Sequence, residues 1–230
     1  METISNHSFV IDKLNNSAFI TYLYTIHCDV NIISEEVYLN TSKENKTVKI
    51  VSLIKNNNFL IYKNLIFKLI NKGYVKERAK EEINKLYNTF NLSIDKDKLD
   101  DIELVKLSLI NALIDTDIII IKNIFIDFNY KERNKIINIL KQYCFINNIK
   151  IILLTTNTND LLYSDYTYVI SHYKNQLEGN SINVLKQDLL LNKLNFELPL
   201  VIDLSVKLNF YGLLNDTFKD VESLVNKLWN

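Results

Sequence analysis

Apolar positions recur at helical spacing through much of the first half of the chain. In the segment Val75–Phe90, charged residues fill one side, while Ala79, Ile83, Leu86, Tyr87 and Phe90 mark the other. Asp101–Leu113 repeats the pattern with Leu104, Leu107, Ser108 and Ala112 on one face, and Tyr62–Ile70 is also apolar at helical intervals. Such spacing is typical of helices with one buried face. We therefore predict three helices between residues 62 and 113.

The middle of the chain has a different pattern. Asp117–Ile121 and Lys150–Leu154 are short runs of consecutive apolar, mostly β-branched residues, and a helical pattern over Tyr130–Tyr143 separates them. A short helix near Asn159–Tyr163 and a third strand, Tyr166–Ser171, follow. Continuous apolar strands alternating with helices are typical of a parallel sheet covered on both faces. The pattern predicts an α/β core with right-handed crossovers.

The two ends of the chain differ from this core. Residues 8–40 contain SFVID, AFITYLYTI and EEVYLN, which we interpret as short strands, and residues 46–54 as another strand ending before Asn56–Asn58. From Val184 the sequence is helical again, in VLKQDLLLNKL, Leu200–Leu208 and Val221–Leu228. For residues 1–35 two alternatives stay open, a trimmed β-subdomain and a rearranged one.

Composition narrows the function classes. Lys plus Arg and Asp plus Glu number 27 each, so the chain lacks the basic excess of a dedicated nucleic-acid binder, although a local patch stays possible. The N-terminal segment METISNHSFVIDK lacks the apolar stretch that a signal peptide contains. The apolar runs fall far short of the roughly 20 residues of a membrane span. We expect a soluble protein, or one that reaches a membrane through a partner.

Few residues suggest a metal or catalytic site on their own. Cys28 and Cys144 share no metal-binding spacing, and two buried thiols in a reducing compartment are the simpler interpretation. His27 adjoins Cys28, but adjacent ligands without a second pair are weak evidence for a metal, and His7 and His172 have no partner in sequence. Thr155 and Thr156 could suggest a nucleophile, but no base can be named beside them.

Several segments match a known family in order. They are EEVYLN (35–40), IVSLIKNN (50–57), FLIYKNLIFKL (59–69), LDDIELVKLSLINALI (99–114), DTDIIIIKN (115–123), IILLTTN (151–157), SDYTYVI (164–170) and the tail that begins LNFELPLVIDL. Together they resemble the ATP-binding-cassette (ABC) ATPases, and most of all the energy-coupling-factor (ECF) type, which powers uptake of vitamins and metals. The resemblance covers most of the chain after about residue 30, and the tail is its most family-specific part.

The resemblance implies an architecture. It is an α/β fold with the parallel sheet core of P-loop NTPases, an N-terminal β-subdomain, a helical subdomain at about 74–113 and a C-terminal helical extension. Residues 1–183 would form the cassette-like domain and residues 184–230 the extension. In this family the region around Phe59, Tyr62 and Phe67 receives a helix of the membrane partner, so these residues are a possible coupling interface; a core role is the equal alternative.

The family's nucleotide-binding motifs are absent at the positions where the resemblance places them. No glycine precedes Gly73, so a phosphate loop G-x-x-x-x-G-K-[ST] cannot be written, and the interval between AFITYL and EEVYLN predicts that the loop and its helix are deleted. The degenerate equivalents of the family's site residues are Lys55 (Q-loop), Leu99, Asp100, Asp101, Ile102 and Glu103 (signature), Lys122 and Asn123 (the paired acids), Asn129 (the aspartate of the loop after the second acid) and Thr156 (the switch histidine).

These departures favour a non-catalytic subunit. No catalytic, cofactor-binding or metal-binding residue is expected, and ATP and Mg²⁺, which the family uses, are not expected to bind. The resemblance implies as partners an intact ABC ATPase paralogue and a transmembrane coupling protein, with no nucleic acid, at the cytoplasmic face of the cell membrane. The alternatives are a soluble adaptor that docks through residues 184–230, a decaying reading frame, and an enzyme with a rebuilt site at Asp117 and Lys122, with Asp115 beside them.

Overall fold

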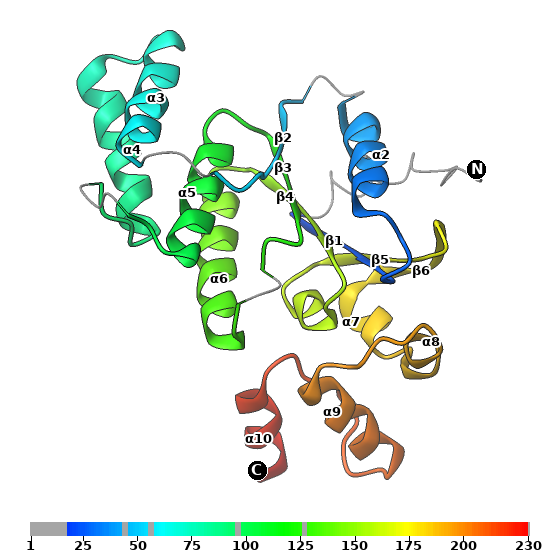
Figure 1. The fold of residues 1–230 in the computed structure, drawn as a ribbon. Helices are drawn as coiled ribbons and strands as arrows, with labels where there is room; N and C mark the ends of the chain where they lie inside the picture. The colour runs from blue at the N-terminus through cyan, green and yellow to red at the C-terminus, as the bar shows by residue number, and fades with distance from the viewer. Residues whose placement is uncertain (1–17, 43–45, 55–57, 95–97, 126–127, 230) are drawn as a thin grey trace. The chain divides into compact units, whose positions relative to one another are not determined.

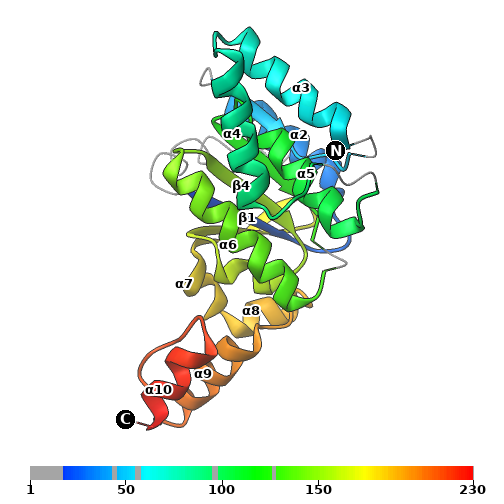
Figure 2. The same ribbon diagram turned by 90° about the vertical axis from the view of Figure 1, so that its left-hand side faces the viewer.

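The computed structural model describes residues 18–42, 46–54, 58–94, 98–125 and 128–229 (Figures 1 and 2). The chain divides into two compact units, which we call unit 1 (residues 1–44 and 152–230) and unit 2 (residues 45–151). No described helix is long and apolar enough to cross a membrane.

Unit 2 contains most of the predicted helices. Its elements are β2 (Val48–Ile50), α3 (Asn58–Asn71), α4 (Lys76–Thr89), α5 (Asp101–Leu113), β3 (Ile118–Lys122) and α6 (Tyr130–Ile146). Strands β2 and β3 pair in parallel, with Val48 opposite Ile118. The four isoleucines of β3 are fully buried, which explains why that strand has no polar alternation.

Unit 1 combines the chain's first described elements with its last third. Its elements are β1 (Phe19–Tyr24), α2 (Val30–Ser42), β4 (Lys150–Thr155), the 3₁₀ helix η1 (Thr158–Leu162), β5 (Tyr166–Ser171), β6 (Lys174–Asn180), α7 (Ser181–Leu185), α8 (Asp188–Lys193), α9 (Leu200–Phe210) and α10 (Val221–Trp229). The strand order in this unit is β4-β1-β5-β6. Strand β5 is parallel to β1 and antiparallel to β6.

The C-terminal helices share a core with these strands. Leu23 of β1 and Val169 of β5 belong to one buried cluster with Leu185, Ile202 and Leu224, which come from α7, α9 and α10. Both views show α9 and α10 side by side (Figures 1 and 2). The division of the chain at residue 184 stays a prediction, because the helices after it contribute to the same core as the strands before it.

Most predicted elements of the core are confirmed, but the interpretation of residues 35–40 is wrong. The segment EEVYLN lies inside α2, not in a strand. Ile33, Val37 and Thr41 recur at intervals of four residues and are all buried, which is helical and not strand periodicity. The polar residues between them, together with the β-branched content, obscured this period.

Two further differences concern β structure. The hairpin strand β6 was missed because its sequence, KNQLEGN, is polar and largely exposed, as an edge strand can be. Of the expected N-terminal β-subdomain, the described part of the first 42 residues contains one strand, β1, which pairs with the core strand β5. SFVID lies outside the described residues.

Candidate functional site

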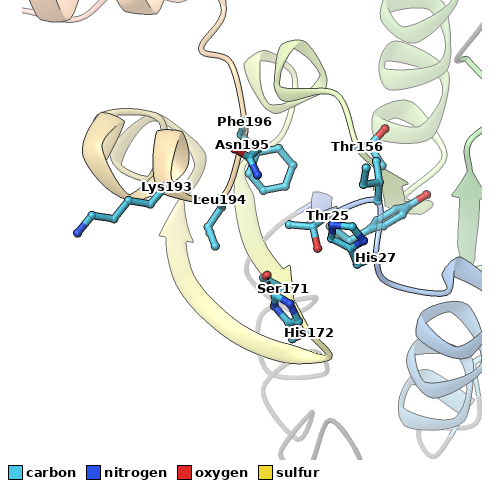
Figure 3. A pocket seen from close by; sticks show the side chains of 11 residues that line it. Thr25, His27, Thr156, Ser171, His172, Lys193, Leu194, Asn195 and Phe196 are labelled. Carbon is cyan, nitrogen blue, oxygen red and sulfur yellow. Dashed lines mark hydrogen bonds between the residues drawn. The ribbon is translucent and has the colours of Figure 1, made fainter.

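The carboxyl ends of the parallel strands in unit 1 meet at a cavity. Strand β1 ends at Tyr24, β4 at Thr155 and β5 at Ser171, and the residues that follow each strand line a hollow of about 340 Å³ (Figure 3). This edge is where open α/β sheets generally bind ligands. The cavity is therefore the leading candidate site among the described residues.

The first wall is the connection between β1 and α2, residues 25–29. The Thr25 N–H donates to the Ile170 carbonyl of β5 (3.1 Å), and the Cys28 N–H donates to the Thr25 carbonyl (2.9 Å). The Thr25 hydroxyl and the Cys28 thiol lie 3.7 Å apart. A strand, a loop and a helix thus follow one another here, and the expectation that the helix after the loop is deleted is wrong.

The loop itself cannot wrap phosphates as a phosphate loop does. Such a loop uses glycines to expose a ring of backbone N–H groups and a lysine to neutralise charge. Residues 25–29, TIHCD, contain neither glycine nor lysine. Cys28 is buried against the turn, so its side chain fills space under the loop.

An acidic residue closes the N-terminus of α2. The Asp29 carboxylate accepts a hydrogen bond from the Asn31 N–H (2.7 Å), and its carbonyl accepts one from the Ile33 N–H (3.2 Å). Helix N-termini attract anions through their free N–H groups and the helix dipole. Here the chain's own carboxylate occupies that position, and it would repel a phosphate brought to the same place.

The turn between β5 and β6 forms the second wall. His172 and Tyr173 both have positive φ, at 49° and 57°, as a two-residue type I′ hairpin requires. The Tyr173 hydroxyl accepts a hydrogen bond from the Asp29 N–H (2.8 Å), which fixes the turn to the β1–α2 connection. The His172 Nδ1 lies 2.9 Å from the Ser171 hydroxyl.

Two imidazole rings come together at this wall. The His27 and His172 ring centroids are 6.3 Å apart, with 26° between the ring planes, and Figure 3 shows both beside the cavity. No partner for His172 could be predicted from the sequence, because the two histidines are far apart in the chain and come together only through the pairing of β1 with β5. Within the described ranges, no group of three or more histidine, cysteine or acidic side chains is placed to hold a metal.

The third wall comes from the connection between α8 and α9, residues 193–196. Phe196 is almost fully buried and Leu194 is half-buried, so this side is apolar. The Thr158 hydroxyl of η1 donates to the Glu197 carbonyl and ties the connection to the strand edge. Sequence analysis missed this wall, because LNF at 194–196 looks like an ordinary helix end.

Thr156, predicted at the switch-histidine position, does lie in this cavity. Beside it, the buried Thr155 hydroxyl donates to the buried Asp160 carboxylate (2.6 Å) and accepts from the Asn157 N–H (3.0 Å). Thr155 therefore has a structural role at the end of β4. Thr156 presents a hydroxyl where a histidine is expected, and no base adjoins it in the hydrogen bonds described for this edge.

In unit 2, the signature-motif positions form a helix cap. The Asp100 carboxylate accepts from the Glu103 N–H (2.8 Å), and the Glu103 carboxylate accepts from the Asp100 N–H (3.0 Å), a complete capping box at the start of α5. Asp101 is exposed, Leu99 is half-buried, and Ile102 lines a small apolar cavity of about 180 Å³. The structure thus brings Leu99, Asp100, Asp101, Ile102 and Glu103 together at one helix end.

The remaining predicted positions of unit 2 lie at other element ends. Lys122 ends β3 and Asn123 follows it with φ 50°. Asn129 caps α6 by accepting from the Glu132 N–H (3.0 Å). Lys55 lies outside the described residues.

The acids proposed for a rebuilt site have structural contacts. Asp117 accepts from the Thr47 N–H (2.8 Å). Asp115 pairs with Lys72. These contacts account for both acids, which weakens the idea of a new active site around Lys122.

The possible coupling residues of α3 do not share one face. Phe59 and Phe67 are exposed, at 48% and 63%, and the Lys63 ammonium lies 4.2 Å from the Phe59 ring centroid. Tyr62 instead turns inward. Its hydroxyl donates to Asn84 (2.8 Å) and its ring meets the Tyr87 ring edge to face. Phe59 and Phe67 remain candidates for an interface, whereas Tyr62 serves the packing of α3 on α4.

Comparison with known proteins agrees on the fold. No protein-family model matches the sequence, and no curated protein matches it. Among solved structures, the chain is similar to cbiO1 from Clostridium perfringens, described as part of the ABC transporter complex cbiONQ, with 14% identity, a TM-score of 0.59, and coverage of 77% of this chain and 83% of that one.

It is also similar to MJ0796, described as a bacterial ABC transporter cassette. Its dimeric structure has 13% identity and a TM-score of 0.54, and its post-hydrolysis state with ADP and Pi has 13% identity and a TM-score of 0.55, each with coverage of 71% of this chain and 85% of that one. With its parallel strands, covering helices and strand–loop–helix edge, this chain therefore has the fold of an ABC ATPase cassette.

Proposed function

We propose that this chain is a non-catalytic, ATPase-like subunit of an ECF-type ABC transporter for micronutrients. It would pair with an intact ATPase paralogue and with a membrane coupling protein, and it would lie on the cytoplasmic face of the membrane through those partners. The fold supports the cassette part of this proposal. The cbiO1 protein, which has a similar fold, is described as part of the ABC transporter complex cbiONQ.

One observation carries the non-catalytic part. The connection from β1 to α2 has no glycine or lysine, and Asp29 occupies the N-terminus of α2 with its own carboxylate. A triphosphate would lose the backbone donors that hold it and would face a negative charge instead. Binding of ATP at this edge should therefore be weak at best.

The other motif positions agree with this interpretation. By the family resemblance, Lys122 and Asn123 stand where two acids hold Mg²⁺ and polarise water. A lysine ammonium cannot ligate Mg²⁺, and an amide is not a general base. At the signature position, Asp100 and Glu103 are used in the cap of α5.

The exposed aromatic residues of α3 are the proposed contact with the membrane partner. Phe59, Leu60 and Phe67 are each about half exposed or more. Apolar side chains on a helix surface suit a groove that receives another helix. Lys63, stacked on Phe59, would lie at the edge of that contact.

The decisive experiment is affinity purification of the tagged chain from its native cells in mild detergent, with mass spectrometry of the proteins that accompany it. Recovery of a membrane-spanning protein together with an ATPase that has a complete phosphate loop supports the transporter role. Recovery of soluble proteins alone, or of the chain alone, contradicts it. A Phe59→Ala, Phe67→Ala variant should lose the membrane protein, whereas the exposed control Lys76→Ala should retain it.

A direct measurement tests the non-catalytic part separately. The purified chain is titrated with Mg·ATP by calorimetry and assayed for phosphate release. We expect neither saturable binding at submillimolar ATP nor turnover. Turnover that disappears in a Lys122→Ala variant would contradict the proposal and favour the rebuilt enzyme site.

The C-terminal helices favour a second candidate, a soluble adaptor. Leu200, Phe210 and Trp229 of α9 and α10 are 77%, 85% and 80% exposed. Such a surface suits a protein partner without any transporter. Absence of the chain from membrane fractions, with recovery of a soluble partner that requires Phe210 and Trp229, would favour this candidate.

A further inference from the structure

We propose that the cavity at the carboxyl ends of β1, β4 and β5 binds a small organic anion: a carboxylate or phosphate group on an apolar or aromatic body. This site is different from a nucleotide site, because its walls include the β5–β6 turn and the α8–α9 connection and because the helix end that would hold a triphosphate is closed by Asp29. The proposal does not depend on the transporter partners.

The charge of the lining points to an anion. Three of the lining side chains, His27, His172 and Lys193, can carry a positive charge. Among the described residues, no aspartate or glutamate lines the cavity. The nearby Asp29 carboxylate is directed at the Asn31 N–H of α2, and its own N–H is held by Tyr173. An anion in the cavity would meet imidazole and hydroxyl donors and no opposing lining carboxylate.

These groups lie at different places around the cavity, and we assign them different roles accordingly. Figure 3 shows His27, Thr25 and Ser171 grouped on one side of the cavity, with His172 below them. The Lys193 side chain extends outward from the end of α8 in the same view. We therefore assign contact with the anionic group to His27 and His172, and an attractive field at the entrance to Lys193.

The opposite wall determines the size and polarity of the group that can carry the anion. Leu194 and Phe196 face the polar strand ends across the cavity in Figure 3. A volume of about 340 Å³ lies near the lower end of ligand pockets, which span roughly 300–1,000 Å³. A single ring or a short branched chain fits this space, with its apolar face on Phe196 and its charged group toward the histidines.

The β5–β6 turn gives an independent reason to assign a role to His172. A type I′ turn favours Asn-Gly, because both residues must adopt positive φ. This turn instead carries His172 and Tyr173, at 49° and 57°; histidine tolerates such angles better than most residues, whereas a tyrosine there is unusual. Tyr173 uses its side chain to hold Asp29, and His172 holds its ring beside His27 through contact with Ser171. Both positions of the turn are thus occupied by side chains that build the wall.

The experiment compares three probes that share a benzene ring: benzoate, phenyl phosphate and the neutral benzyl alcohol. Binding to the full chain is measured by ligand-observed NMR titration. We expect benzoate or phenyl phosphate to bind saturably and benzyl alcohol to bind at least about tenfold more weakly, the loss expected when a charge-assisted hydrogen bond is absent. Preference between the two anions distinguishes a carboxylate ligand from a phosphate ligand. Equal binding of all three probes overturns the proposal.

Three variants locate the site. His172→Asn keeps the left-handed backbone favourable, so the fold should be retained or stabilised while affinity for the anionic probe falls about tenfold. His27→Ala should have the same effect on affinity, and Phe196→Leu should weaken all three probes together. The matched control is the substitution His7→Ala, which removes the third histidine of the chain. Anion binding unchanged in both His27→Ala and His172→Asn overturns the assignment.

Discussion

The beginnings of α2 and α5 make an instructive pair. Each helix starts where the family resemblance expects contact with nucleotide, and each start is capped by a side-chain carboxylate, Asp29 in α2 and Asp100 in α5. Around α5, the cap is exposed and completed by Glu103. Around α2, the cap is joined by a hairpin turn, a buried Thr155–Asp160 pair and a cavity lined by two histidines. The same kind of cap thus lies at a plain helix end in unit 2 and beside a shaped pocket in unit 1.

Thiol labelling should give the largest difference between the two units. Cys144 is 1% exposed within α6, and burial raises the pKa of its thiol to about 12. Cys28 lies in the turn under the cavity, which can open locally. We expect Cys28 to react with a disulfide reagent on the order of a hundredfold faster than Cys144. Labelling rates in the Cys28→Ser and Cys144→Ser variants measure each thiol alone. Equal rates would contradict the expected difference between the two thiols.

The same thiol predicts a pH dependence. The folded pKa of Cys144 lies above the value of an unfolded thiol, about 8.5, so the unfolded chain releases its proton first as pH rises. Its contribution to stability is therefore complete below about pH 8.5 and is lost progressively toward pH 12. Burial raises the pKa of Tyr143 to about 12 in the same direction. Urea unfolding measures the free energy of unfolding at pH 8 and at pH 10.5. This free energy should fall less between the two pH values in Cys144→Ala than in the unaltered chain.

Of the substitutions around the starts of α2 and α5, Asp160→Ala should lower the free energy of unfolding most. Asp160 is 2% exposed and accepts from the buried Thr155 hydroxyl, so its removal leaves a buried donor without this acceptor. We expect a loss of about 2–3 kcal/mol in urea unfolding. A double-mutant cycle with Thr155→Val isolates the pair, and an interaction energy near zero would show that the pair does not hold the strand end.

Asp100→Ala tests the plain helix end. Loss of an N-cap costs about 1 kcal/mol, and the capping box adds Glu103 to the same cap. The neighbouring exposed Asp101→Ala is the control and should change the free energy of unfolding by less than about 0.5 kcal/mol. Similar losses in both variants would mean that the cap contributes nothing specific.

Asp29→Asn should have the smallest effect on stability and the clearest effect on ligands. Asparagine caps helices as well as aspartate, so the free energy of unfolding should change by less than about 0.5 kcal/mol. Removing the negative charge should strengthen binding of inorganic pyrophosphate severalfold, since the α2 N-terminus no longer repels it. Mg·ATP should still not be hydrolysed. Unchanged pyrophosphate affinity would contradict the closing role assigned to Asp29.

The core of the fold could be predicted from sequence, because buried strands such as Ile118–Ile121 and amphipathic helices such as α4 follow simple periods. Helix α2 could not, since its inward face is only Ile33, Val37 and Thr41 among polar neighbours. Asp100, Lys122 and Asn129 lie at element ends, and their assignment to motifs of the family stays a prediction. The cavity was missed because His27, His172 and Phe196 meet only through strand pairing and the packing of the α8–α9 connection.

Several helices of this chain are followed by an asparagine where glycine is the usual residue. Helices α4, α6 and α8 finish with an asparagine in the left-handed conformation, Asn91, Asn148 and Asn195, in the position where α9 has Gly212. At each, the following N–H donates back into the last turn, as in Leu92 to Tyr87 and Leu213 to Leu208 (both 2.9 Å). Asparagine can therefore take the place of glycine at these helix ends without changing the path of the backbone, and glycine positions alone are a poor guide to where the helices of this chain end.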